Sequence, residues 1–204
     1  MKLLKDEARN VSKDVFSPEQ IAALIDKAPS EDWKGAILCG YYTGLRLRDV
    51  AGLEWSAVDY SESAITVTTK KTGKDVTLPL HPQFAAWLLR QTRGIGKAPV
   101  FPTLAGKSGA GKSGLSMQSK RIMDKAGIKG RLLRESTGAG RSQSSLSFHS
   151  LRHTFNSEMA RQGTPLELRQ KLTGHASAAM NEIYTRHEIE SLRAAALKVR
   201  PIPM

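Results

Sequence analysis

The stretch Phe148-His-Ser-Leu-Arg-His-Thr-Phe155 opens a segment with helical spacing that continues to Gln162. Its His149 and Arg152 are three residues apart and therefore share one face of the predicted helix. A second histidine follows in Leu172-Thr-Gly-His175, and Tyr184 lies nine residues after it. These residues favour chemistry at a phosphodiester, with the tyrosine as nucleophile and the cationic and imidazole groups stabilising a pentacoordinate phosphorus and moving protons without a metal.

Two cationic segments lie upstream of this stretch. Thr43-Gly-Leu-Arg46 ends an apolar helical run, and Lys70, Lys71 and Lys74 occupy a turn between two β-branched runs. An arginine fork donates two hydrogen bonds to a phosphate, which makes Arg46 and Arg152 the candidate phosphate ligands. Lys71 is the candidate donor of a proton to the leaving oxygen, if neighbouring cations lower its pKa. Each residue alone has an ordinary structural explanation, so the indication rests on their combination.

The composition indicates a single core and a polyanionic partner. The chain has 204 residues, of which 40% are hydrophobic, and a net charge of +12. Residues 104–152 hold ten basic and two acidic residues, so this quarter carries +8 of the charge. Nucleic acid is the first partner to expect and an anionic membrane the second. No apolar run is long enough to span a bilayer, no secretory signal is recognisable, and Cys39 in its apolar run is predicted to be a core residue.

The pattern of apolar residues predicts a mainly α fold with one small antiparallel β-sheet (α+β). Helices are expected at residues 17–29, 30–44, 46–53, 81–91, 116–126, 148–162, 165–172, 176–187 and 189–199. A hairpin is expected from residues 64–69 and 75–79, and a short strand at Val100-Phe101. Residues 105–115 and 130–147 are rich in Gly and Ser and are predicted to be loops, the second a mobile one.

In these motifs the chain resembles the catalytic domain of the tyrosine recombinases of the phage-integrase family. Thr43-Gly-Leu-Arg46 resembles the family's first arginine box, with Asp49 where an acidic residue is usual. Lys71-Thr-Gly-Lys74 resembles its hairpin lysine segment, and Phe148 to Phe155 its second box. The resemblance covers about residues 17–190 and includes six catalytic positions: Arg46, Lys71, His149, Arg152, His175 and Tyr184.

The resemblance implies a site-specific DNA recombinase. Tyr184 would form a 3′-phosphotyrosyl bond and release a 5′-hydroxyl, and rejoining would reverse this step without ATP, metal or another cofactor. Lys71 would be the general acid, Asp49 a supporting residue, and Lys70, Lys74 and Arg141 would contact DNA. The implied partners are double-stranded DNA and further protomers in a tetrameric synapse, in the cytoplasm of a bacterial or phage system.

The implied organisation is a leader at residues 1–16, a catalytic domain at 17–190 and a C-terminal helix and tail at 191–204. The family's N-terminal core-binding domain is expected to be absent. The C-terminal helix is expected to pack in trans in an assembled complex, and the isolated chain to be a monomer.

Three other functions stay open. Gly106-Lys-Ser-Gly-Ala-Gly-Lys112-Ser113 matches a phosphate-binding loop and would indicate a nucleotide-binding protein, but no apolar strand ending in Asp follows to hold magnesium. The chain could instead be a fragment that binds DNA without recombining it. It could also be a nicking and closing enzyme that resembles a type IB topoisomerase.

Overall fold

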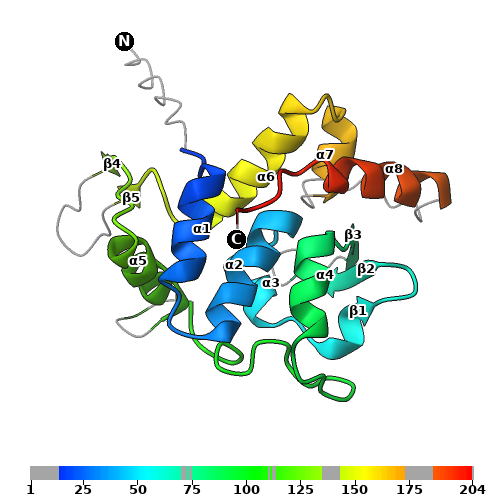
Figure 1. The fold of residues 1–204 in the computed structure, drawn as a ribbon, viewed down its shortest axis with the longest axis horizontal. Coiled ribbons are helices and arrows are strands. Elements are labelled where there is room, and N and C mark those ends of the chain that lie inside the picture. Colours follow the sequence, from blue (N-terminus) through cyan, green and yellow to red (C-terminus); the bar gives the residue numbers. More distant parts are fainter. Residues whose placement is uncertain are drawn as a thin grey trace, which may run out of the picture.

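The computed structural model describes residues 14–69, 73, 75–109, 111, 114–134, 143–172 and 186–203 (Figure 1). The helices are α1 (Pro18–Asp26), α2 (Glu31–Thr43), α3 (Leu47–Ala51), the 3-10 helix η1 (Trp55–Ala57), α4 (Pro82–Leu89), α5 (Leu115–Lys125), α6 (His149–Arg161), α7 (Leu166–Leu172) and α8 (Arg186–Leu197). The strands are β1 (Val58–Asp59), β2 (Ala64–Thr68), β3 (Asp75–Pro79), β4 (Leu132–Arg134) and β5 (Gln143–Ser144). This confirms the expected mainly α fold with a small antiparallel sheet. Within these ranges, no helix combines the length and apolar character that crossing a bilayer requires.

Serine caps begin the first two helices, as their sequences predict. The Ser17 hydroxyl accepts the Gln20 N–H, the Gln20 side chain accepts the Ser17 N–H, and Pro18 is the first helical residue. The Ser30 hydroxyl accepts the N–H of Trp33 at the start of α2. These bonds satisfy N–H groups that the first helical turn leaves without partners, so the predicted starts are confirmed.

Helix α2 lies at the centre of the fold and contacts α1, α4 and α6 (Figure 1). Its side chains are buried on every side from Ala36 to Thr43. A methyl group at Gly40 would lie 2.8 Å from Phe148 and 3.0 Å from Leu151, so this glycine is what allows α6 to approach so closely. Cys39 is fully buried and burial raises the pKa of its thiol to about 12, which confirms it as a core residue.

The three-stranded sheet has the order β1-β2-β3 and is antiparallel throughout. The predicted hairpin pairs Ile65 with Leu78 and Val67 with Val76, and all four side chains are buried. Strand β1 was not predicted, because a two-residue strand is too short to show an alternating pattern. Helices α7 and α8 both contact β3, so this sheet supports the C-terminal part of the chain.

Three sequence-based predictions of local structure are wrong. The 130–147 segment is not simply a mobile loop, because β4 pairs with β5 and residues 145 and 146 are buried. Val100-Phe101 forms no strand, since the only ladder contact there is an isolated bridge between Glu54 and Pro99. The expected break between residues 187 and 189 does not occur, because α8 is continuous from Arg186 to Leu197.

The C-terminal residues after α8 pack against α2 and α4 of the same chain. Val199 and Ile202 are buried, and the Ile202 N–H donates to the Gln83 side chain at 3.0 Å and to the Tyr42 hydroxyl at 3.2 Å. Gln83 in turn donates to the Ile202 carbonyl at 3.2 Å. In the single chain the C-terminal helix and tail thus pack in cis, and packing in trans within an assembly stays a prediction.

His81 joins α4 to this tail. Its ring stacks on the Tyr42 ring with centroids 3.8 Å apart, and its Nδ1 accepts the Gln83 N–H at the start of α4. The ring also hydrogen-bonds the backbone of Val199, and burial lowers the pKa of the imidazole to about 4. A neutral His81 is therefore part of the folded structure, because a proton on Nδ1 would face the Gln83 N–H.

We expect the free energy of unfolding to fall as the pH drops from about 6.5 to about 4, by up to about 3 kcal/mol from His81 alone. The unfolded histidine takes up a proton in this window and the folded one does not, so acid favours the unfolded chain. Urea unfolding across this window would measure the slope. His81→Asn is the matched variant, since asparagine can still cap α4 but does not titrate. Equal slopes in the two proteins would contradict the assignment.

Candidate active site

The turn at residues 43–46 places the first candidate arginine. Gly44 ends α2 with a φ of 65°, and a methyl group there would lie 2.7 Å from the Phe155 ring. The Thr43 hydroxyl accepts the Leu45 N–H at 3.2 Å and donates to the carbonyl of Cys39. Arg46 is the residue immediately before α3, and its carbonyl accepts the N–H of Asp49 at 2.8 Å. The Thr-Gly-Leu-Arg sequence is thus a helix end, a left-handed turn and a helix start in succession.

Helix α6 places the second candidate arginine beside the first. The close contact between α2 and α6 brings Arg152 to Gly44, and the Arg152 Nη1 donates to the Gly44 carbonyl at 2.8 Å. His149 is the first residue of α6 and is exposed, and its ring lies edge-on to the His153 ring at 5.0 Å. Residues from two distant boxes therefore meet at one place.

Arg152 is a buried cation with an incomplete set of partners. Its side chain is 5% exposed, and its Nη2 has no hydrogen-bond partner among the described residues. Burial, with a contribution from the charge of Arg46, lowers the pKa of its guanidinium to about 10, while Asp49 acts in the opposite direction. A buried donor without a partner among the described residues and a second guanidinium nearby both raise the free energy of the charged Arg152 side chain. An anion bound between the two arginines would relieve both effects.

A cavity of about 1100 Å³ opens beside these residues, between α3, α5 and the β4–β5 pair. Cationic and imidazole groups contribute to its lining: Arg46, Arg48, Lys120, Lys129 and His149. Its acidic residues are Asp49 and Asp124, the second of which is paired with Lys120 at 2.8 Å. Its apolar surface includes Met123, Ile128 and Phe148. Four cations therefore face two carboxylates among the charged groups of the lining, which suits an anion with apolar parts.

Arg46, Asp49, His149 and Arg152 are the predicted site residues that lie in the described ranges, and the structure brings them together. Three predicted catalytic residues, Lys71, His175 and Tyr184, lie outside these ranges, as do the predicted DNA contacts Lys70, Lys74 and Arg141. In the sequence, β2 and β3 lie on either side of Lys71. Helices α7 and α8 lie on either side of His175 and Tyr184.

Sequence reasoning did not single out Arg48, Lys120 or Lys129 as site residues. The spacing of Ser116, Lys120 and Met123 on α5 was the available signal, since positions three and four apart share a helix face. That spacing alone does not say what the face contacts.

The phosphate-binding-loop motif lacks the surroundings that its function needs. Both sheets in the described part of the chain are antiparallel, whereas this motif joins a strand of a parallel sheet to a helix. Helix α5 does follow, with Gly114 as its N-cap residue, but the nearest ladder contact before the motif is an isolated bridge between Glu54 and Pro99 and not a strand that leads into it. Lys112 and Ser113 lie outside the described residues.

Two curated relatives are similar in sequence to this chain over most of its length. Tyrosine recombinase XerA of Pyrococcus furiosus is 27% identical over 186 residues, which cover 88% of this chain and 59% of that protein. Tyrosine recombinase XerC of Chromobacterium violaceum is 31% identical over 180 residues, covering 84% of this chain and 55% of that protein. The chain thus spans between half and two thirds of the length of these relatives.

Solved structures share the fold. The integrase from mycobacterium phage Brujita superposes with a TM-score of 0.66 and 24% identity, over 99% of this chain and 61% of that one. A lambda integrase dimer bound to a core site superposes with a TM-score of 0.59 and 17% identity, over 86% of this chain and 62% of that one. The sequence profile of the phage integrase family matches residues 14–190, which is most of the chain. The chain therefore belongs to the phage integrase family.

Proposed function

We propose that this chain is the catalytic domain of a site-specific DNA recombinase that cleaves and rejoins strands through a 3′-phosphotyrosyl intermediate. The observation that supports this best is the buried Arg152, with a donor that no described group satisfies, beside Arg46 and Asp49. The relatives XerA and XerC, both tyrosine recombinases, support the same reaction.

The proposed reaction begins with attack of the Tyr184 hydroxyl oxygen on the scissile phosphorus. The bond from phosphorus to the 5′-oxygen breaks, and that oxygen leaves as a hydroxyl with a proton from Lys71. A 5′-hydroxyl then attacks the phosphotyrosine, restores the phosphodiester and frees the tyrosine. The phosphotyrosyl bond conserves the energy of the original one, so no ATP is needed, and the arginines and histidines would supply the charge stabilisation that a metal provides in other phosphoryl transfers.

The two arginines would hold the phosphate during this displacement. Charge on the non-bridging oxygens grows toward the transition state, and donors already fixed in place stabilise it without reorganising. Arg152 is fixed by the Gly44 carbonyl at 2.8 Å and by burial, so its second amino group can serve the phosphate. His149, which lines the same cavity as Arg46, and His175 would assist by accepting a proton or donating to the phosphate.

Double-stranded DNA is the proposed substrate, and we propose that its backbone binds at the cavity between α3, α5 and the β4–β5 pair. The cations Arg48, Lys120 and Lys129 at the cavity would contact backbone phosphates, which position DNA without reading its sequence. The lambda integrase of similar fold was solved as a dimer bound to a core site, which supports DNA and further protomers as partners. We propose a tetrameric synapse on DNA, in a bacterial or phage cytoplasm.

A covalent-trapping experiment tests this function. The protein is incubated in EDTA and without ATP with duplexes that carry a nick close to candidate sites, so that a cleaved fragment diffuses away and rejoining is blocked. We expect a protein–DNA band that resists denaturant and disappears on protease treatment. Tight DNA binding with no such band on a library of duplexes would instead favour a module that only binds DNA.

A further inference from the structure

Residues 14–16 are bonded to α6 at one point and to the segment that leads into α6 at another. The Phe16 N–H donates to the Thr154 hydroxyl at 2.9 Å, and that hydroxyl donates to the Ser150 carbonyl within α6 at 2.8 Å. Two residues earlier, the Asp14 N–H donates to the Ser145 carbonyl at 3.3 Å. These partners are more than 130 residues away in sequence and flank His149 and Arg152.

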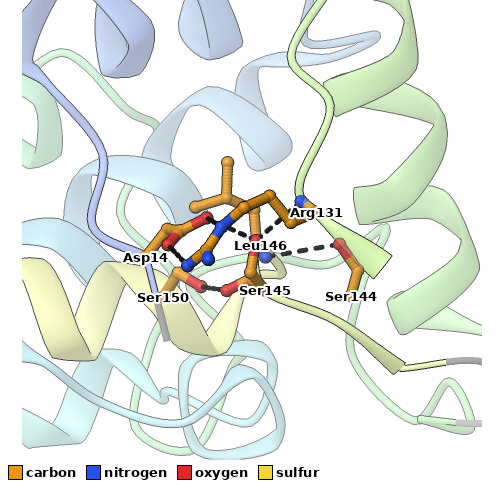
Figure 2. A network of polar contacts seen from close by, with 6 residues as sticks. All are labelled: Asp14, Arg131, Ser144, Ser145, Leu146 and Ser150. Atoms are coloured by element: carbon orange, nitrogen blue, oxygen red, sulfur yellow. Dashed lines mark hydrogen bonds and ion pairs between the residues drawn. The ribbon is translucent and has the colours of Figure 1, made fainter. Parts of the chain in front are cut away.

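Ser145 is the node of this network, and every one of its polar groups is bonded (Figure 2). Its hydroxyl donates to the Asp14 carboxylate and accepts the Arg131 N–H at 2.8 Å. Its N–H donates to the Arg131 carbonyl at 2.8 Å, and its carbonyl also accepts the Ser150 hydroxyl at 3.3 Å. The Arg131 guanidinium closes the ring by pairing with both Asp14 oxygens, at 2.5 and 3.3 Å. Ser145 itself is fully buried, whereas the Arg131–Asp14 pair lies at the surface, with the Arg131 side chain 68% exposed.

The start of α6 depends on this node. Phe148, which precedes the helix, makes no side-chain cap bond. Ser150 instead ties the helix to the residues just before it: its hydroxyl accepts the Ser147 N–H at 3.1 Å and donates to the Ser145 carbonyl. His149 lies between these residues as the first residue of the helix. Its position therefore follows that of Ser145, which Asp14 and Arg131 hold.

We infer that Asp14 is a positioning residue for the reaction, acting on His149 through Ser145 and Ser150. The inference rests on the proposed function. Asp14 touches neither phosphate nor base in this role; its carboxylate holds the segment that sets the first turn of α6. A displacement of about 1 Å in a group that acts on the phosphate is enough to slow a reaction strongly.

The test compares Asp14→Ala with Asp26→Ala, which removes an aspartate from an exposed pair with Lys27. Single-turnover cleavage at saturating protein, DNA affinity and thermal unfolding are measured for each. We expect Asp14→Ala to lower the cleavage rate about tenfold with DNA affinity nearly unchanged, and Asp26→Ala to change neither. Asp14→Asn keeps an oxygen for the Ser145 hydroxyl and should recover part of the rate. Ser145→Ala removes the node without changing charge and should match Asp14→Ala.

A second readout does not depend on activity. The imidazole signals of His149, assigned with His149→Gln, should shift in the NMR spectrum of Asp14→Ala and stay in place in Asp26→Ala. Unmoved signals, or an unchanged rate in a folded Asp14→Ala protein, would overturn the inference. Wild-type protein that forms no covalent product, together with signals that do move, would count against the proposed function and leave the positioning role supported. If Asp14→Ala unfolds, Asp14→Asn carries both measurements.

Discussion

Tyr184→Phe is expected to abolish the covalent protein–DNA product while leaving DNA affinity unchanged. The substitution removes one oxygen and keeps the ring, so the proposed nucleophile is lost with little change in shape. The loss should be roughly 10⁴-fold or more, since removing a nucleophile removes the reaction path and not only one of its supports. Denaturing gels of the trapping reaction measure it.

The matched control for this variant is Tyr60→Phe. Tyr60 packs its ring against the Arg93 guanidinium, whose carbon lies 5.5 Å from the ring centroid, and phenylalanine keeps that contact. The control should form the covalent product at the wild-type rate. A band that persists in Tyr184→Phe would show that another side chain is the nucleophile and would refute the assignment.

Arg152→Ala should lower the single-turnover cleavage rate by about 10²- to 10³-fold with the fold intact. Removing one fixed donor from the charge that develops in a transition state typically costs this much. The fold should tolerate the change, because two effects on stability oppose each other. The variant loses the hydrogen bond to the Gly44 carbonyl, but it also no longer has to bury the charged guanidinium, whose pKa burial lowers to about 10. The cleavage rate of Arg152→Lys should fall between those of the wild-type protein and Arg152→Ala, since lysine keeps a charge but not the planar fork.

Arg161→Ala on the same helix is the control for Arg152. Its guanidinium is exposed and paired with Glu158, which retains Arg200 as a partner at 2.8 Å when Arg161 is removed. Cleavage should therefore be unchanged in this variant. An Arg152→Ala protein with wild-type cleavage would remove Arg152 from the site, and one that is largely unfolded would leave Arg152→Lys to decide through its rate.

The parts of the fold that sequence predicts well are those set by neighbouring residues. Ser17 with Pro18, Ser30 and Gly44 determine where α1 and α2 begin or end, because caps and left-handed turns are local interactions. The alternation in β2 and β3 likewise predicts their pairing. Residues 143–147 were wrongly predicted to be a mobile loop, because serines of this kind are typical of loops. The Ser145 hydroxyl in fact donates to Asp14, 131 residues away in the chain, and no local pattern records such a bond.

The same division holds for the site. Sequence by itself determined which residue types are present and in what order. It also determined the local structure around them, namely the turn after α2 that leads to Arg46 and the helical spacing of His149 and Arg152. Only the tertiary structure decided that Arg152 reaches the carbonyl of Gly44, 108 residues away, and that Ser145 is held by Asp14. Helix ends and spacing follow from interactions within a few residues. The charge environment of Arg152 depends on how closely α6 packs on α2, and hence on the absence of a side chain at Gly40.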